Sequence, residues 1–278
     1  SVMGNSSCIA INEKKKNQAK PVVPFVAHAK KFQPIIDQFH TLEQVQTALR
    51  SAGLESSNLI VGVDFTKSNT WTGTRTFGGR SLHDTGVLNP YQQVLSILGR
   101  TLSVFDDDNL IPIYGFGDAH TQDKSCFPFY PDRPCHGFEE CLRRYNEIAP
   151  MIKLAGPTNF GPVIRSAIDT VRTEKQYHIL VIIADGQVTN YNDTAAAIVE
   201  ASNYPLSIIM VGVGDGPFDT MEEFDDGLPS RKFDNFQFVH FNDIIRKHPR
   251  NADPAFALAA LMEVPEQFQT IRQLGYLG

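Results

Sequence analysis

The hydrophobic residues of this chain fall into short continuous runs, separated by longer stretches in which they recur every three or four positions. The four strongest runs span residues 59–63, 110–116, 177–184 and 206–213. Because a run that is apolar on both faces suits a strand covered on both sides, these runs predict the strands of a parallel sheet. A further strand is predicted at 236–241.

The stretches between the runs predict helices. Apolar residues repeat at helical spacing in residues 90–105, 137–148, 163–174, 194–202, 219–224 and 254–263. Two more helices are predicted before the first strand, at 32–39 and after Thr41, which opens a capping-box sequence with Gln44. In contrast, residues 70–83 are rich in Thr, Gly and Arg and predict a short edge hairpin around 76–79.

Strands that alternate with helices predict an α/β fold. We expect a doubly wound, mostly parallel sheet of about six strands, with helices on both faces. One domain at residues 28–268, which includes the two N-terminal helices, lies between a flexible tail at 1–27 and a C-terminal tail at 269–278. The composition, 42% hydrophobic and 20% charged, is typical of a globular protein.

Charge is distributed unevenly along the chain. The formal net charge is −6, but residues 1–31 carry six lysines and one glutamate, which leaves −11 for the remainder. General nucleic-acid binding requires a basic face, so we expect no nucleic-acid partner for the folded part.

Cysteine content and hydropathy bear on the cellular compartment. The four cysteines lack CxxC spacing, so they predict no zinc site and no disulfide framework, and they favour a reducing compartment. No apolar run approaches the roughly 20 residues of a membrane span, and the first residues do not form a signal-peptide pattern. We therefore expect an intracellular protein, cytoplasmic, with nuclear or membrane-associated placement as alternatives.

The first residues contain a candidate lipidation site. The segment from Met3 to Cys8 resembles an N-myristoylation start, with Cys8 in place of the usual Ser or Thr. If Met3 is the natural start, Gly4 would carry the acyl chain. Cys8 and the lysines at 14–16 would then supply the second signal that stable membrane anchoring needs. The alternative is an inert tail.

The first predicted strand ends in oxygen-bearing side chains at alternate positions. Asp64, Thr66 and Ser68 follow its apolar run directly, and open α/β sheets bind their ligands at the carboxyl ends of the strands. Hard oxygen donors suit Mg²⁺, or Mn²⁺ or Ca²⁺ in its place. On their own, Asp64 and Thr66 are equally consistent with capping the loop or helix that follows.

Two further loops strengthen the metal hypothesis. Thr158 precedes a predicted helix, and Asp185 comes directly after the most apolar strand. If the strands before Asp64 and Asp185 are neighbours at the switch point of the sheet, all three loops converge on one crevice. Two carboxylates and three hydroxyls would then fill most of an octahedral shell and leave a position for water or a ligand oxygen.

These motifs carry a family resemblance. The Asp-x-Thr-x-Ser segment at 64–68, the threonine of loop 156–160 and the strand-terminal Asp185 resemble the metal-ion-dependent adhesion site of von Willebrand factor A (vWA) domains. The copine-type branch of that family is similar in segments 64–69, 89–91, 114–117, 156–160, 205–209, 211–214 and 264–267. Segments 55–62 and 233–239 extend the similarity to the copine-like vWA domain of plant RING-type ubiquitin ligases.

The resemblance covers roughly residues 28–268 and implies a vWA fold and a role in protein binding. It implies that a partner protein supplies a carboxylate to a magnesium-type site formed by Asp64, Thr66, Ser68, Thr158 and Asp185. Residues 1–278 contain neither the C2 domains of copines nor the Cys/His array of a RING. Ubiquitin ligase activity is therefore expected only if a RING is supplied elsewhere. No catalytic residue is predicted, which leaves open whether the chain is an enzyme.

Three functions are compatible with this pattern. The leading hypothesis is a metal-dependent protein-binding module that acts as an adaptor. An alternative is the substrate-recruiting part of a RING-type E3 ubiquitin ligase. A third is a Mg²⁺-dependent phosphohydrolase with Asp64 as nucleophile, but such enzymes usually place a second carboxylate two positions on, where this chain has Thr66.

Overall fold

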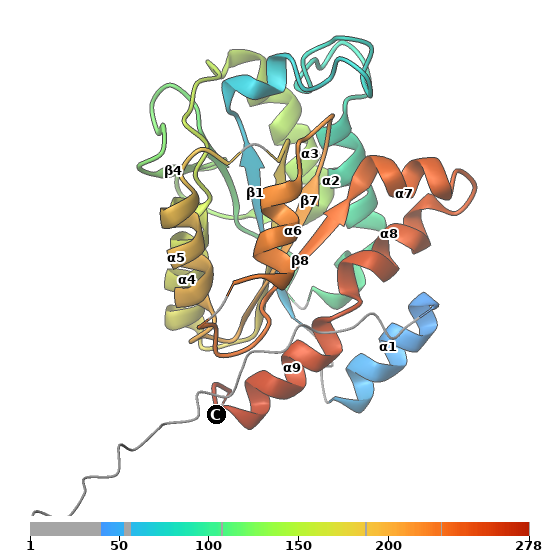
Figure 1. Ribbon diagram of the computed structural model, residues 1–278, viewed down its shortest axis with the longest axis vertical. Coiled ribbons are helices and arrows are strands. Elements are labelled where there is room, and N and C mark those ends of the chain that lie inside the picture. Colours follow the sequence, from blue (N-terminus) through green and yellow to red (C-terminus); the bar gives the residue numbers. More distant parts are fainter. Residues whose placement is uncertain (1–39, 53–56, 107, 187, 229, 278) are drawn as a thin grey trace, which may run out of the picture. The chain divides into compact units, whose positions relative to one another are not determined.

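The computed structural model describes residues 40–52, 57–106, 108–186, 188–228 and 230–277 (Figure 1). The predictions for Gly4, Cys8 and a helix at 32–39 concern residues outside this set. No helix within the described part of the chain is long and apolar enough to cross a membrane.

A six-stranded sheet with the order β4-β3-β1-β6-β7-β8 forms the centre of the fold (Figure 1). Its strands are β1 (Asn58–Asp64), β3 (Ile113–Phe116), β4 (Cys126–Pro128), β6 (His178–Ala184), β7 (Leu206–Gly212) and β8 (Phe236–His240). All pairs are parallel except β3 with β4. The prediction of a doubly wound, mostly parallel sheet is confirmed.

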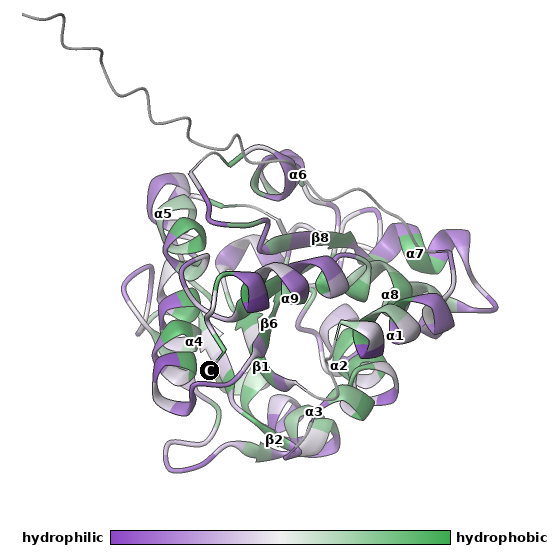
Figure 2. Ribbon diagram, turned by 90° about the horizontal axis from the view of Figure 1, so that it is seen from below, coloured by the Kyte–Doolittle hydropathy of each residue, from purple (hydrophilic) through white to green (hydrophobic). Residues whose placement is uncertain are grey.

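Helices cover both faces of this sheet, and the strand residues alternate between the two cores. In β1, Leu59 and Val61 belong to one core and Ile60 to the other, as the two-residue period of a strand requires. The first core is shared with α1 (Leu42–Ser51), α2 (Pro90–Thr101), α3 (Gly137–Ile148), α7 (Phe241–Lys247), α8 (Ala252–Leu261) and α9 (Val264–Gln273). The second is shared with α4 (Gly161–Glu174), α5 (Tyr191–Ala201) and α6 (Asp219–Asp226). Helices such as α4 and α5 are hydrophobic toward the sheet and hydrophilic outside (Figure 2).

The helix starts follow local sequence signals. Thr41 accepts a hydrogen bond from Gln44 N and the Gln44 side chain reaches back to Thr41 N, so the predicted capping box is present. Asn89 and Gln92 form a second capping box at the start of α2. The loop before α2, which contains His83, is therefore anchored at its end.

Several predicted elements differ from the structure. The predicted strand 110–116 is broken at Pro112, which lacks a backbone N–H for the ladder; β2 (Leu110–Ile111) pairs separately with β5 (Cys135–His136). The edge strand β4 is only three residues long and was not predicted. The helices α7 and α9 were not predicted, and α9 runs through residue 268, where the sequence places the end of the domain.

The predicted hairpin around residues 76–79 is wrong. The segment that follows η1 (Lys67–Thr70) is a series of turns, closed by bonds from Phe77 N and Gly79 N to Gly73 O, each of 2.9 Å. The backbone donors of Arg75 and Thr76, which a ladder would have paired, bond the carboxylate of Asp215 instead. The loop is therefore fixed by a contact with a distant segment.

Candidate metal centre

The switch point of the sheet lies between β1 and β6, which are parallel neighbours. Their register pairs Val63 with Ile183, so Asp64 and Asp185 both follow at the carboxyl edge. From β1 the chain winds to β3 on one side, whereas from β6 it winds to β7 on the other, and open sheets bind ligands where this reversal occurs. The topology therefore shows that these two strand ends are neighbours, as predicted.

The five predicted ligands are placed at this edge on three segments. Asp64 ends β1, Thr66 and Ser68 lie at the start of η1, Thr158 lies in the loop before α4, and Asp185 follows β6. All five side chains are buried; the exposed fraction does not exceed 6% for any of them. Polar side chains that are buried together at a strand edge need internal partners or a bound ion.

Hydrogen bonds within residues 64–72, which form the first loop of the site, bring three of the five residues together. Thr66 N donates to Asp64 Oδ1 over 2.7 Å, and the hydroxyls of Thr66 and Ser68 are 3.0 Å apart. Asp185 is held by Thr72, whose Oγ1 donates to Asp185 Oδ2 over 3.0 Å. The first loop therefore also positions the carboxylate that comes from β6.

Thr158 is held by a different set of contacts. Its backbone N–H bonds Thr189 Oγ1 over 3.2 Å, and its carbonyl accepts from the amides of Thr189 and Asn190. Its loop reaches the first loop through the bond from Lys67 N to Ala155 O, of 2.6 Å. The structure thus places Thr158 on a loop bonded to that of Thr66 and Ser68.

The electrostatics of the two carboxylates favour a cation between them. Burial, and next the charge of Asp185, raise the pKa of Asp64 from 3.8 to about 8. In the described structure Asp64 Oδ2 is buried and has no hydrogen-bond partner. A divalent cation would neutralise both charges and satisfy this oxygen, so the residues fit the predicted ion.

The donor set consists wholly of oxygen atoms, and only two of its five side chains are acidic. Among the described residues, no three or more His, Cys, Asp or Glu gather in a way that could hold a metal. A site that binds through hydroxyls as well as two carboxylates differs from such a cluster, and its hard oxygens suit Mg²⁺, Mn²⁺ or Ca²⁺.

A buried aromatic cluster lies against the first loop and was not predicted. The His83 ring stacks between Phe65 and Tyr91, with centroids 4.7 and 4.1 Å away. His83 Nε2 lies 2.7 Å from the carbonyl oxygen of Asp64, and Nδ1 lies 2.8 Å from the hydroxyl of Tyr145. Because a carbonyl only accepts, Nε2 carries the proton and Nδ1 accepts from Tyr145. Burial lowers the pKa of His83 to about 3, which keeps the ring neutral.

Hydrogen bonds through Asn69 also connect the aromatic cluster to the first loop. Tyr91 donates to Asn69 Oδ1 over 2.7 Å, and Asn69 Nδ2 donates to the carbonyl of Thr66 over 3.1 Å. Burial, and next the charges of Asp64 and Asp185, raise the pKa of Tyr91. Phe65, Asn69 and Tyr91 lie in segments that carried the family resemblance, whereas His83 had no local signal.

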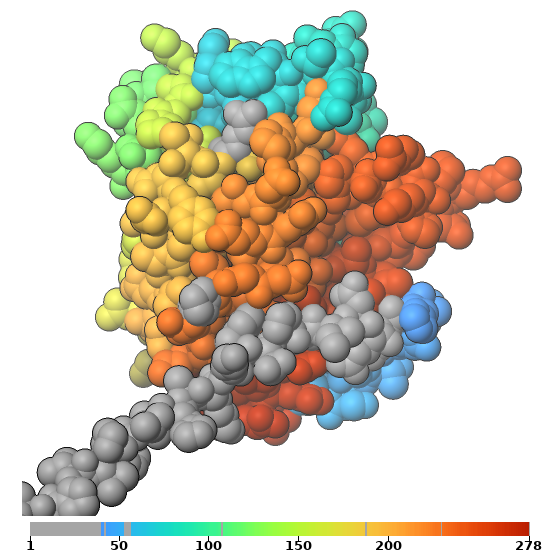
Figure 3. Space-filling model, in the orientation of Figure 1, coloured from blue at the N-terminus to red at the C-terminus, as the bar shows by residue number. Residues whose placement is uncertain are grey.

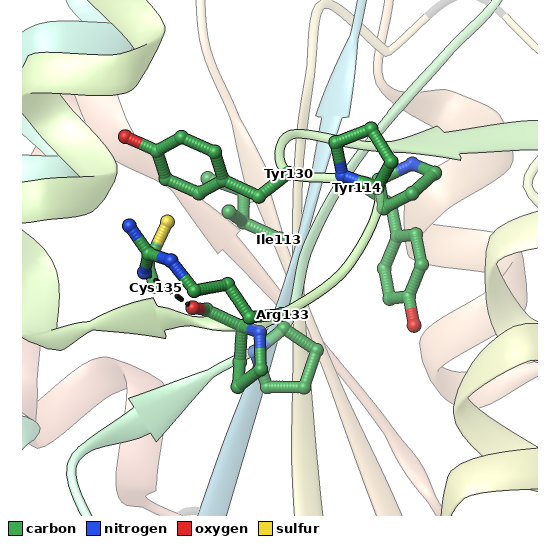
Figure 4. Close-up of a pocket in the computed structure, with 9 residues that line it drawn as sticks. Ile113, Tyr114, Tyr130, Arg133 and Cys135 are labelled. Carbon is green, nitrogen blue, oxygen red and sulfur yellow. Dashed lines mark hydrogen bonds between the residues drawn. The ribbon is translucent and has the colours of Figure 1, made fainter.

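A cavity of about 280 Å³ lies between β3, β4 and β5, away from the sheet edge that carries the five predicted ligands (Figure 4). Tyr130 and Arg133 line it, and the Arg133 guanidinium stands over the Tyr130 ring, 4.3 Å from its centre. Arg133 also pairs with Glu140 over 2.8 Å. None of the five predicted ligands lines this cavity.

Comparison with known proteins gives strong matches along the sequence. The chain is 55% identical over 266 residues to the E3 ubiquitin-protein ligase RGLG5 of Arabidopsis thaliana, covering 90% of this chain and 61% of that protein. It is 53% identical over 248 residues to Copine family protein 2 of Caenorhabditis elegans, covering 87% of this chain and 3% of that protein. The chain therefore spans less than two thirds of the length of each of these relatives.

Solved structures are more distant. The manganese-loaded TRAP protein of Plasmodium vivax is 12% identical, with a TM-score of 0.46, and the match covers 70% of this chain and 72% of that one. Proximal thread matrix protein 1 from the mussel byssus, solved with a zinc-occupied MIDAS motif, is 12% identical with a TM-score of 0.45, covering 73% and 46%. At these scores neither structure supports an inference about the metal site of this chain.

A family model described as Copine matches residues 81–278, which include Thr158 and Asp185. This match extends over most of the chain and agrees with the copine-type resemblance of the sequence motifs. The chain belongs to the copine family.

Proposed function

We propose that this chain is a protein-binding module that engages its partner through a divalent metal held by Asp64, Thr66, Ser68, Thr158 and Asp185. The observation that carries the proposal is the buried Asp64 carboxylate, whose Oδ2 has no hydrogen-bond partner within the described structure and which lies beside a second buried carboxylate. Such an arrangement is costly unless a cation compensates it. Mg²⁺ is the expected ion, with Mn²⁺ or Ca²⁺ as alternatives.

The residues of the site would have distinct roles. Asp64 and Asp185 supply negative charge, and the three hydroxyls supply neutral oxygens that orient the ion. When bound, the metal would accept a carboxylate oxygen from a partner protein at the coordination position that the five side chains leave open. The hydrogen bonds of His83 and Asn69 fix the backbone of the first loop, so that its oxygens need little rearrangement on binding.

A calorimetric titration of Mg²⁺ into protein treated with EDTA tests this proposal. We expect one site in the wild type, which Asp185→Asn removes. Asp169→Asn is the matched control, because Asp169 is 76% exposed on α4 and lies outside the site. Saturable Mg²⁺ binding that survives in Asp185→Asn would refute the assignment. Turnover of an aryl phosphate that is lost in Asp64→Asn would instead support the phosphohydrolase.

A second candidate function is the recruitment of substrates for ubiquitination. It is favoured by the identity of 55% with a protein named as an E3 ubiquitin ligase, 61% of whose length is covered. In this proposal a RING is contributed by sequence outside residues 1–278 or by another subunit. Sequencing of the full transcript tests the first of these arrangements: a Cys/His zinc-binding pattern after residue 278 supports it, and a stop codon there contradicts a RING that follows in the same chain.

Membrane attachment of the N-terminal residues is a separate proposal. Gly4 and Cys8 would carry acyl chains, which together with Lys14, Lys15 and Lys16 would hold an intracellular protein at an anionic membrane surface. Metabolic labelling with an alkyne analogue of myristate tests it in cells. Label should be present in the wild type and absent in Gly4→Ala, and an unlabelled wild type would rule out acylation of Gly4.

A further inference from the structure

Two cysteines lie together where the chain turns from β5 into α3. Cys135 begins β5, and Cys141 lies in the second turn of α3. The turn between them is tight, because Gly137 has a positive φ of 71° and the amide of His136 bonds the side chain of Glu140 over 2.6 Å. As a result, the thiols of Cys135 and Cys141 interact directly.

Both thiols are enclosed by the first core and are chemically free. The exposed fraction is 1% for Cys135 and 0% for Cys141, and neither residue forms a disulfide in this structure. Two thiols in contact can do what a single buried thiol cannot, since an oxidised sulfur of one can be attacked by the sulfur of the other. The pair can therefore close to a disulfide once an oxidant reaches one member.

The cavity between β3, β4 and β5 brings a small molecule to one thiol of the pair. Cys135 lines this cavity of about 280 Å³, whereas Cys141 does not. Because Pro131 and Arg133 of its wall are exposed, the cavity lies at the surface. The segment between β3 and α3, green in Figure 3, forms the upper left of that view. A water molecule takes about 30 Å³ in the liquid, so a molecule as small as hydrogen peroxide fits the cavity.

Charged side chains surround the Cys135 end of the cavity. The guanidinium carbons of Arg133 and Arg144 lie 4.3 and 4.8 Å from the centre of the Tyr130 ring. In Figure 4 the sulfur of Cys135 is drawn between the Tyr130 ring and the Arg133 guanidinium. The carboxylate nearby is that of Glu140, which bonds Arg133 through both of its oxygens, over 2.8 and 2.9 Å.

The two thiols differ in how readily they lose a proton. Interaction with the Cys141 thiol is the main cause that lowers the pKa of Cys135. The charges of Arg133 and Arg144 lower it further, while burial and the charge of Glu140 oppose the shift. The interaction with Cys135, and next burial, raise the pKa of Cys141. Cys135 is therefore the thiol that forms the nucleophilic thiolate, and Cys141 keeps its proton.

We propose that Cys135 and Cys141 are a peroxide-sensitive pair, which hydrogen peroxide entering the cavity converts to a reversible disulfide. The sulfur of Cys135 attacks one peroxide oxygen as the O–O bond breaks, and the departing hydroxide takes up the proton that the thiol has lost, which gives a sulfenic acid and one water. The sulfur of Cys141 then attacks the sulfenic sulfur, and the hydroxyl leaves with the Cys141 proton as a second water. One peroxide is thus reduced by two electrons, and two thiols are oxidised to one disulfide.

This arrangement matches what peroxide sensing requires. A cysteine that senses peroxide has a stabilised thiolate, a path to solvent and a second cysteine beside it that resolves the sulfenic acid. Cys135 meets the first two conditions through its arginine neighbours and the cavity, and Cys141 meets the third. The proposal does not involve the metal centre, so it stands or falls independently of the proposed function.

Thiol counting and peptide mapping of the whole chain test the proposal. After treatment of the folded protein with equimolar hydrogen peroxide, alkylation in denaturant should find two free thiols in place of four. Trypsin leaves residues 125–143 as one peptide, since the bond before Pro134 resists it, and Glu-C then cuts after Glu139 or Glu140. The fragment with Cys141 should stay joined to the fragment with Cys135, and dithiothreitol should separate them.

Variants assign the roles of the two thiols. Cys141→Ser should stop at the sulfenic acid, which dimedone traps at Cys135, whereas Cys135→Ser should give no adduct on Cys141. Cys126→Ser is the matched control, because Cys126 lies in the same proteolytic fragment as Cys135 but contacts the hydroxyl of Ser166, 3.1 Å away. This variant should form the link as the wild type does.

The wild type alone decides the proposal, even if a serine variant fails to fold. Four free thiols after peroxide treatment, a link from Cys141 to Cys126, or a sulfinic acid at Cys135 without a link would each overturn it. A link that forms only in urea would also overturn it, because the contact would then belong to the unfolded chain. A dimedone adduct on Cys141 in Cys135→Ser would contradict the role of Cys135 as the attacking thiol.

Discussion

Replacing Asp64 by asparagine removes one negative charge from the metal centre and keeps the shape of the side chain. The side-chain oxygen of the variant can still accept the bond from Thr66 N, which is 2.7 Å long in the wild type. The new amide group would face Asp185, whose charge contributes to the raised pKa of Asp64. Without metal, the variant should therefore lack the repulsion between the carboxylates of Asp64 and Asp185 that the wild type contains.

The size of this effect depends on pH. In the unfolded chain Asp64 loses its proton near pH 3.8, whereas in the folded chain it keeps the proton up to about pH 8. Between these values the folded state binds one more proton, so the free energy of unfolding of the wild type falls as pH rises, by about 1.4 kcal/mol per pH unit. At pH 7 the burial of Asp64 costs the metal-free folded state on the order of 4 kcal/mol.

Urea unfolding at pH 5 and pH 8 measures this cost. In EDTA, Asp64→Asn should be more stable than the wild type, and by a larger margin at pH 8. Mg²⁺ at about 100 times its dissociation constant should stabilise the wild type by about 2.7 kcal/mol and leave the variant unchanged. A variant that is less stable than the wild type in EDTA by the same amount at both pH values, and that gains equally from Mg²⁺, would refute this reasoning.

Two further pairs of variants test the support of the metal loop. Tyr91→Phe and Tyr177→Phe each remove a buried hydroxyl that makes one hydrogen bond of 2.7 Å, and each should lower the free energy of unfolding by about 1 kcal/mol. Only Tyr91→Phe should also weaken Mg²⁺ binding, by about threefold in calorimetry; equal Mg²⁺ affinities would contradict the supporting role of Tyr91. Gly117→Ala places a methyl group against the side chain of Thr66 and should cost more than about 2 kcal/mol and weaken Mg²⁺ binding. Gly78→Ala shares the positive φ but meets open space, so it should cost about 1 kcal/mol and leave Mg²⁺ binding intact; matching losses in the two glycine variants would rule out the contact as the cause.

The positions of the main strands could be predicted because each is a long apolar run that changes abruptly to polar residues. That change occurs at Asp64 after β1 and at Asp185 after β6, which is why both carboxylates could be assigned to the same edge. Thr158 was a candidate because its loop precedes a predicted helix, and the family resemblance then agreed with that choice. The assignment of these residues to a metal remains a prediction, which is supported by the buried Oδ2 of Asp64, an atom with no hydrogen-bond partner among the described residues.

Other parts of the site could not be predicted because they depend on contacts between distant segments. His83 lies in an irregular loop, and its ring is fixed by a carbonyl 19 positions earlier and a hydroxyl 62 positions later. The failed hairpin has the same cause, since Asp215 bonds the amides of Arg75 and Thr76 across about 140 positions. Local propensity carries no information about such partners.

Diffraction from crystals grown with Mn²⁺, recorded where manganese scatters anomalously, tests the central claim most directly. We predict one strong anomalous peak enclosed by the oxygens of Asp64, Thr66, Ser68, Thr158 and Asp185, bound directly or through water. The peak should be absent from crystals of Asp64→Asn grown in the same way. Saturating Mn²⁺ that leaves this position without a peak in the wild type would contradict the claim that the chain holds a metal there.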